Sequence, residues 1–432
     1  MIRPRTALPL LATLLSASAL AAPASLPLYT GGKAAPGAQV MFGDFDVQAA
    51  LEGDAGKMAA DPKLPAAIVE ARRTDKDGKN DALGLTWKNA WFSTVRIDSK
   101  PLDLSPYLAH GTVSFDLKVN ELAQGGLTYR VGCGAGCERK IVDVLPARAL
   151  QGKGWKHISY ALSCFHHEGD NPSAVTQPFA LDGTGAGNVE IANIRIDANG
   201  KPNHTCVDYR KQSVTPETLG ESWALDWWMP RHQEKLAEIA RRKAAHEPTD
   251  LVLIGDSITH NWEKDGKAVL AERLDKYHPL DLGYGGDRTE NVLWRLQHGE
   301  VDGIAPKVAT LMIGTNNTGH RMEDPALIFK GIARDIQELR RRLPNTKILL
   351  LAIFPRGETA EDGQRRNNEA VNAMLPKLAD NKHVFFLNIN QAFLQPDGKL
   401  SKDIMPDLLH PNEKGYRIWA DAMQPELDKL MR

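Results

Sequence analysis

The sequence has little cysteine and almost no net charge, and each shortage excludes a class of protein. Its 432 residues include 4 cysteines, 53 lysines and arginines, and 54 aspartates and glutamates. A formal net charge of −1 creates no broad field that would recruit nucleic acid or an anionic membrane. Neither Cys-x-x-Cys nor His-Glu-x-x-His spacing occurs. We therefore expect no metal and no cofactor, and the pair His166 and His167 alone does not predict a metal site.

Long apolar runs are also missing beyond the N-terminus. None reaches the roughly 20 residues that span a bilayer, so we expect no integral membrane contact. Two positive charges fall within the first five residues, and a short apolar stretch at residues 7–20 ends in small side chains. This pattern is typical of a secretory signal peptide cleaved after Ala21 or Ala22. We expect residues 1–21 to be removed and the protein to be periplasmic or secreted.

Four cysteines in an exported protein predict two disulfide bonds, because such compartments are oxidising. Three pairings are possible. We favour Cys133 with Cys137, which closes a small glycine-rich turn, and Cys164 with Cys206 by elimination. Free buried thiols are the alternative.

The two halves of the chain differ in hydrophobic period. Between residues 26 and 210, several segments alternate apolar and polar side chains as half-buried strands do; they are residues 111–119, 126–131, 155–162 and 189–196. No clear helical period separates them. We therefore predict an antiparallel β-sandwich over residues 26–210, followed by a polar linker at residues 211–222.

Beyond the linker, strand and helix patterns alternate. Short apolar runs that are typical of strands buried on both faces occur at residues 251–254, 280–282, 308–313, 348–353 and 384–389. Asp324 and Pro325 begin a helix whose apolar residues repeat at threes and fours as far as Leu343. This alternation predicts an α/β fold, a parallel sheet between two layers of helices, over residues 223–432.

Polar strings follow three of these strands and precede the last helix. GDSIT at residues 255–259 places Ser257 at the end of a strand, the edge at which open α/β sheets bind ligands. YGGD at residues 284–287 and GTNN at residues 314–317 follow two further strands, and DLLH occupies residues 407–410. Taken alone, a Gly-Asp-Ser string is common in turns; the four strings in this order indicate a site.

Together these strings resemble the consensus blocks of the SGNH (GDSL-like) serine hydrolases. GYGGDRTENVLWRL at residues 283–296 and IFPRG at residues 353–357 are most similar to the α subunits of platelet-activating-factor acetylhydrolase and their bacterial relatives. The resemblance covers about residues 223–432, nearly half of the chain. Ile258 departs from the family, where leucine is usual. No Gly-x-Ser-x-Gly string occurs, which counts against the α/β-hydrolase fold.

Residue by residue, the resemblance makes Ser257 the nucleophile, His410 the general base and Asp407 the carboxylate that orients the imidazole. The chemistry agrees, because a serine hydroxyl reacts only when a base takes its proton, and histidine can do so at neutral pH. The implied oxyanion hole comprises the backbone N–H groups of Ser257 and Gly286 and the side-chain amide of Asn316. Such donors stabilise the charge that develops on the substrate oxygen.

The first half resembles the galactose-binding-like sandwich at the end of some secreted glucan glucohydrolases. The matching segments are residues 81–87, 162–165 and 178–181, with the turn bounded by Cys133 and Cys137. Trp87, Trp91 and Trp155 could stack on sugar rings or belong to the core.

A sugar-binding sandwich beside an esterase predicts a secreted enzyme that removes O-acetyl groups from a carbohydrate or polysaccharide. Its partner would be an acetylated carbohydrate or another small ester. Two alternatives remain. One is an esterase for lipid or lysophospholipid; the other is a carbohydrate-binding protein with an idle hydrolase domain.

Overall fold

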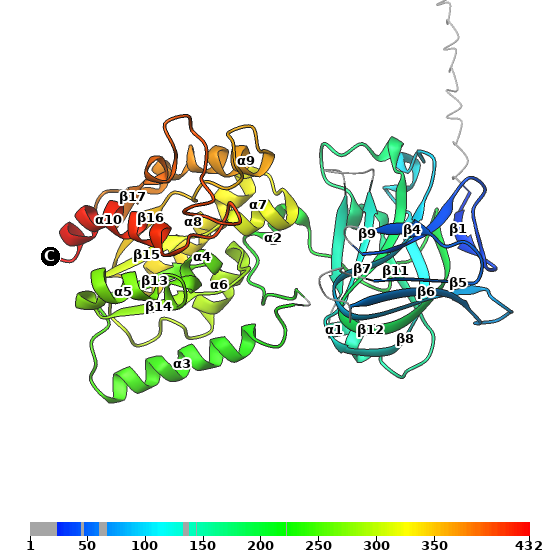
Figure 1. Cartoon of the computed structure of the whole chain (residues 1–432), viewed down its shortest axis with the longest axis horizontal. Helices are drawn as coiled ribbons and strands as arrows, with labels where there is room; N and C mark the ends of the chain where they lie inside the picture. The colour runs from blue at the N-terminus through cyan, green and yellow to red at the C-terminus, as the bar shows by residue number, and fades with distance from the viewer. Residues whose placement is uncertain (1–23, 45–46, 60–66, 133–137, 144, 222) are drawn as a thin grey trace, which may run out of the picture.

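The computed structural model describes residues 24–44, 47–59, 67–132, 138–143, 145–221 and 223–432. Figure 1 shows an antiparallel β body in the first half of the chain and a body of alternating strands and helices in the second. The predicted fold class is confirmed in both halves. Cys133 and Cys137 lie outside the described residues.

The first body is one 12-stranded sheet that folds over on itself into a sandwich. Its strands are β1 (Leu26–Thr30), β2 (Lys33–Ala34), β3 (Gln39–Gly43), β4 (Gln48–Ala50), β5 (Ala55–Ala59), β6 (Ile68–Thr74), β7 (Ala82–Asp98), β8 (Thr112–Gln124), β9 (Leu127–Gly132), β10 (Arg139–Asp143), β11 (Lys156–Ala161) and β12 (Gln177–Asp197). Two short helices accompany them, α1 (Leu145–Ala149) and α2 (Tyr209–Gln212). All strand pairs in this body are antiparallel, as the alternating sequence pattern predicts.

Strand β12 organises this sheet, because it pairs with β1, β7, β8 and β9. The sequence predicted only its second half, since Gly183 and Gly187 interrupt the alternation. The indole of Trp87 occupies the space that side chains at these glycines would need. Trp87 is buried and donates its Nε1 hydrogen to the carbonyl of Thr184 at 2.9 Å. Its position in the core excludes it from stacking on a sugar.

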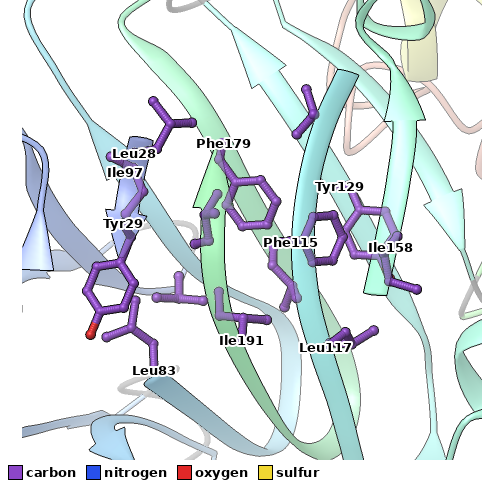
Figure 2. Packing of buried hydrophobic residues seen from close by; sticks show 14 of the residues in the cluster. Leu28, Tyr29, Leu83, Ile97, Phe115, Leu117, Tyr129, Ile158, Phe179 and Ile191 are labelled. Carbon is purple, nitrogen blue, oxygen red and sulfur yellow. The ribbon is translucent and has the colours of Figure 1, made fainter. Parts of the chain in front are cut away.

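Large aromatic and aliphatic side chains fill the space inside the sandwich (Figure 2). Phe115 on β8 lies with its ring centre 4.9 Å from Tyr129 and 5.0 Å from Phe179, so strands β8, β9 and β12 meet there. Burial of rings of this size is the main stabilising contribution in such a core. The predicted disulfide between Cys164 and Cys206 is present.

The second body contains a five-stranded parallel sheet in the order β14-β13-β15-β16-β17. The strands are β13 (Leu251–Gly255), β14 (Pro279–Gly283), β15 (Val308–Met312), β16 (Lys347–Leu351) and β17 (Val384–Leu387). The helices are α3 (Trp228–Ala244), α4 (Ser257–His260), α5 (Lys267–Arg273), α6 (Thr289–Gln297), α7 (Thr315–Arg321), α8 (Pro325–Arg342), α9 (Gly363–Asn372) and α10 (Glu413–Leu430). None of the helices in the described ranges combines the length and apolarity that a bilayer crossing requires.

Successive side chains of each strand enter different cores, which creates three layers. Leu251 and Leu253 face a cluster that includes α5 and α10, whereas Val252 and Ile254 face one that includes α3, α6, α8 and α9. A strand buried on both faces therefore reads as a continuous apolar run. Helix α8 begins as predicted, with the Asp324 carboxylate accepting the Ala326 N–H at 2.7 Å.

The linker segment is bound closely to the second body. The Thr289 hydroxyl donates to the Ser213 carbonyl at 3.0 Å, and the Asn291 amide donates to the Glu217 carbonyl at 2.9 Å. These contacts hold the chain that leads into the site.

A buried aspartate on β14 should make stability depend on pH. Burial, and then Glu263, raise the pKa of Asp281 to about 8. The folded protein therefore keeps a proton that the unfolded chain releases near pH 4, and the fold weakens by about 1.4 kcal/mol per pH unit between those values. Asp281→Asn has no proton to lose and can still accept the Gly283 N–H, which lies 2.6 Å from Asp281 Oδ1.

We expect the free energy of unfolding of Asp281→Asn, relative to the natural chain, to increase between pH 5 and pH 8. Urea unfolding at both values measures it. Asp403→Asn, which changes an exposed aspartate of the same body, is the control and should produce parallel curves. A constant difference between Asp281→Asn and the natural chain would show that Asp281 is ionised in the fold.

Candidate active site

Ser257 is the first residue of α4, directly beyond the end of strand β13, which lies between β14 and β15. The preceding Asp256 caps the helix by accepting the Ile258 N–H at 2.9 Å. Ile258 is buried, and its carbonyl accepts the Tyr416 hydroxyl at 2.7 Å, so the residue that departs from the family still serves as a core contact. The N–H of Ser257 belongs to the first turn of a helix, where donors lack partners within the helix.

A chain of hydrogen bonds joins Ser257, His410 and Asp407. Ser257 Oγ lies 2.8 Å from His410 Nε2, and His410 Nδ1 lies 2.6 Å from Asp407 Oδ2. The serine is far from the other two residues in sequence, and the fold brings them together. This is the geometry in which an imidazole removes a serine proton while a carboxylate holds its tautomer.

A tight turn holds the carboxylate and the imidazole in place. Asp407 Oδ1 accepts the N–H groups of Leu409 at 3.0 Å and of His410 at 2.7 Å, and Leu408 takes a left-handed conformation with φ of 60°. Gly357 donates its N–H to the Leu408 carbonyl at 3.0 Å. Burial opposes ionisation, but the hydrogen bonds from His410 lower the pKa of Asp407 below its ordinary value. Asp407 is therefore an anion at neutral pH.

The proposed oxyanion donors meet at the ends of β14 and β15, on either side of β13. Gly286 has φ of +77°, a conformation that favours glycine. Among the hydrogen bonds between described residues, none uses its N–H group as donor. Asn316 donates one amide hydrogen to the Asp287 carbonyl at 3.0 Å, which fixes the amide beside Gly286 and leaves its second hydrogen for another acceptor.

The neighbouring Asn317 and Asp287 are occupied elsewhere. The Asn317 amide donates to Glu323 at 2.8 Å, inside a buried network. The Asp287 carboxylate accepts hydrogen bonds from Trp228 at 2.6 Å and Arg295 at 2.8 Å. Both side chains therefore hold the loops that present Gly286 and Asn316.

Two tryptophans that the sequence did not single out lie beside this site. Trp223 covers Gly286 so closely that a side chain at that glycine would overlap the indole. Trp227 lies beside Trp223, with ring centres 6.3 Å apart and planes 24° apart, and also lies 6.0 Å from the ring of His260. The only sequence signal is the density of tryptophan, three in residues 223–228.

Arg356 is a further missed residue. Its guanidinium donates to the Thr315 carbonyl at 2.9 Å and to the Thr315 hydroxyl at 3.1 Å. These bonds anchor the residue that immediately precedes Asn316. Burial lowers the pKa of Arg356 below its ordinary value, but the group remains a cation.

The imidazole of His320 links the charged pair Arg288 and Glu221 to the ring of Trp223. His320 lies 6.3 Å from its ring, and Arg288 lies 3.0 Å from His320 and 2.8 Å from Glu221. Burial and then Arg288 lower the pKa of His320 to about 3, so this imidazole is neutral. Burial opposes the ionisation of Glu221, but Arg288 and then Lys140 of the sandwich lower its pKa to about 2.

Among the sandwich tryptophans whose side chains the structure describes, Trp155 is the partly exposed one. Lys76 and Lys118 place their ammonium groups 5.8 Å and 5.9 Å from its ring centre. The side chain of Trp91 lies outside the described residues.

Comparison with known proteins gives matches in both halves. Residues 253–418 match the GDSL-like Lipase/Acylhydrolase family, and residues 50–196 match the Galactose-binding domain-like family. Platelet-activating factor acetylhydrolase IB subunit alpha1 of Homo sapiens is 31% identical over 207 residues, which cover 47% of this chain and 84% of that protein. Subunit alpha2 of Rattus norvegicus is 34% identical over 194 residues, covering 44% and 79%.

A solved structure is similar to the first half. The extra C-terminal domain of exo-1,3/1,4-beta-glucanase (ExoP) from a Pseudoalteromonas species covers 43% of this chain and 100% of its own, with 13% identity and a TM-score of 0.35. The acetylhydrolase subunits match over most of their own length and at more than 30% identity. The chain therefore belongs to the GDSL-like lipase/acylhydrolase family, and its N-terminal domain is galactose-binding-like.

Proposed function

We propose that the protein is a secreted serine esterase that removes O-acetyl groups from a carbohydrate or polysaccharide through an acyl-enzyme on Ser257. The observation that carries the proposal is the hydrogen-bonded chain from Ser257 through His410 to Asp407. In this proposal the sandwich spans residues 26–210, the linker residues 211–222 and the hydrolase domain residues 223–432.

In the first half of the reaction, Ser257 Oγ attacks the acetyl carbonyl carbon while His410 Nε2 takes the hydroxyl proton. The carbonyl oxygen becomes an oxyanion. It accepts hydrogen bonds from the N–H groups of Ser257 and Gly286 and from the free amide hydrogen of Asn316. Asp407 stabilises the imidazolium. The imidazolium then gives its proton to the departing sugar oxygen, which leaves as an alcohol.

In the second half, water replaces the alcohol. His410 takes a proton from the water as its oxygen attacks the acetyl carbon on Ser257. The same donors stabilise the second oxyanion. Collapse releases acetic acid and returns the proton to Ser257 Oγ, so the enzyme is restored without a cofactor.

Different observations support the two parts of the proposed substrate, the acetyl group and the carbohydrate alcohol. The relatives are named acetylhydrolases, which supports a short acyl group. The sandwich supports a carbohydrate alcohol, because it matches a galactose-binding-like family. The disulfide between Cys164 and Cys206 supports an oxidising, extracytoplasmic compartment.

The second candidate substrate is an acetylated lipid. It is favoured by the names of the relatives, which refer to platelet-activating factor. Acetate release from a panel that contains acetylated xylan, acetylated pectin and acetylated lysophospholipid distinguishes the two. Faster turnover of the lipid would overturn the carbohydrate assignment. If neither the panel nor a chromogenic acetate ester releases acetate, the protein is not an esterase. The remaining interpretation would then be a carbohydrate-binding protein with an idle hydrolase domain.

Asn316→Ala should lower kcat by about 10² to 10³-fold with little change in KM, because it removes a donor that acts mainly in the transition state. Steady-state kinetics on a chromogenic acetate ester measure this. Asn317→Ala is the matched control. It removes the amide that binds Glu323, so it should lower the melting temperature. Its effect on kcat should be much smaller than that of Asn316→Ala. Equal effects of the two variants on kcat would contradict the role of Asn316.

A further inference from the structure

Trp223 is a large aromatic side chain that remains exposed to solvent beside the candidate active site. It is 42% exposed, one of four large apolar side chains in the described part of the chain that remain open to solvent. One part of the indole lies directly on Gly286. The remaining surface therefore faces the space next to a proposed oxyanion donor. A large aromatic surface kept in water beside a reaction centre is typical of a binding contact.

Trp227 fixes the position of this ring. Its Nε1 donates to the Trp223 carbonyl at 3.1 Å, and the two indoles are nearly parallel. On its other side Trp227 lies near His260, whose Nδ1 accepts the Gly285 N–H at 3.3 Å. The two indoles and the loop at Gly285 and Gly286 thus form a connected platform, which needs little ordering when a ligand arrives.

The surroundings of the platform favour a sugar ring over an alkyl chain. A pyranose has a C–H face that packs on an aromatic ring and hydroxyl groups around its edge. His320 lies beside Trp223, and its Nδ1 faces the Arg288 guanidinium at 3.0 Å, so the neutral imidazole keeps its Nε2–H as a donor for such a hydroxyl. An alkyl chain would instead place apolar surface against this polar group and gain nothing from it.

Trp223 lies where the remainder of an ester would lie if its carbonyl oxygen were bound at Gly286. When the carbonyl oxygen accepts the Gly286 N–H, the remainder of the substrate lies close to the ring that covers Gly286. We propose that Trp223, supported by Trp227, is the subsite for the glycosyl ring that carries the acetyl ester. This inference rests on the proposed function, and it assigns carbohydrate recognition to the hydrolase domain itself.

The test compares two acetate esters on the full chain. Trp223→Ala should reduce kcat/KM at least about 10-fold for a singly acetylated xylobiose, whereas kcat/KM for ethyl acetate, which has no ring, should change less than about 2-fold. Trp223→Phe should retain most activity on the sugar ester, because it keeps an aromatic face. Val207→Ala, which shortens another of the exposed large apolar side chains of the described residues and has no assigned role, is the control and should have natural rates on both esters.

The outcomes separate the subsite from the proposed function. Equal losses on both esters would overturn the subsite and make Trp223 a support for the Gly286 loop. Unchanged rates on both would also overturn it. If the natural chain hydrolyses ethyl acetate but no acetylated sugar, the proposed function fails and the subsite fails with it. Natural activity on the sugar ester that is independent of Trp223 rejects the subsite alone.

Discussion

Replacing Ser257 with alanine should reduce kcat for ester hydrolysis by about 10⁴- to 10⁶-fold and leave KM nearly unchanged. The substitution deletes the oxygen that would carry the acyl group, and no neighbouring group replaces it. Within the described part of the chain, no other serine side chain is hydrogen-bonded to a histidine. Chromogenic acetate hydrolysis measures the effect.

The fold should tolerate this substitution, because within the described residues His410 is the single hydrogen-bond partner of Ser257 Oγ. Thermal unfolding of Ser257→Ala should therefore match the natural chain within about 2 °C, in line with the small effect of surface changes on a domain of this size. A fluorophosphonate, which labels activated serines, should add one adduct to the natural chain and none to the variant. If Ser257→Ala hydrolysed the ester at the rate of the natural chain, Ser257 would be excluded as the nucleophile.

The sequence was sufficient to predict where the polar site lies. Strands β13, β14 and β15 each end in a polar string, and the carboxyl ends of neighbouring parallel strands share one edge of a sheet. Ser257, Gly286 and Asn316 therefore had to lie near one another once the strands were recognised. The pairing of Asp407 with His410 was also accessible, because the two residues belong to one short loop.

The tryptophan platform could not be predicted in this way. Trp223 and Trp227 precede the first strand of the sheet, and neither follows a strand end nor belongs to one of the strings that carry the family resemblance. Trp223 reaches Gly286 from a distant part of the sequence because the linker folds back onto α6. Such a contact depends on the path of an irregular segment, for which the sequence carries no periodic signal.

The burial of several charged residues near the site also could not be predicted from the sequence. No motif or periodic signal in the sequence predicts that Arg288, Glu290 and Arg321 lie together in the interior, because charged residues are rarely buried. In the structure Arg288 and Glu290 are buried, Arg321 is largely buried, and both arginines pair with Glu290, at 2.8 Å and 2.6 Å. Removing one partner would leave an unpaired buried charge, which typically costs about 3–5 kcal/mol. The network stabilises the loops on which the proposed oxyanion donors lie.

His410→Ala should reduce kcat almost as much as Ser257→Ala, by about 10⁴-fold or more, because an unactivated serine hydroxyl is a poor nucleophile. The imidazole is partly exposed, and its removal opens a space that leads to Ser257 Oγ. Added imidazole should therefore restore part of the activity in a saturable manner. The same addition should not restore Ser257→Ala, which serves as the control.

The double variant tests whether the two residues act as one unit. If His410 functions only by activating Ser257, then Ser257→Ala combined with His410→Ala should be no slower than either single variant. Multiplied losses would mean that His410 contributes a second, independent function, such as direct activation of water on the substrate. The 2.8 Å hydrogen bond between Ser257 Oγ and His410 Nε2 favours the first result. In the proposed mechanism the same imidazole also activates the water that attacks the acyl group, so one histidine in contact with one serine would serve both halves of the reaction.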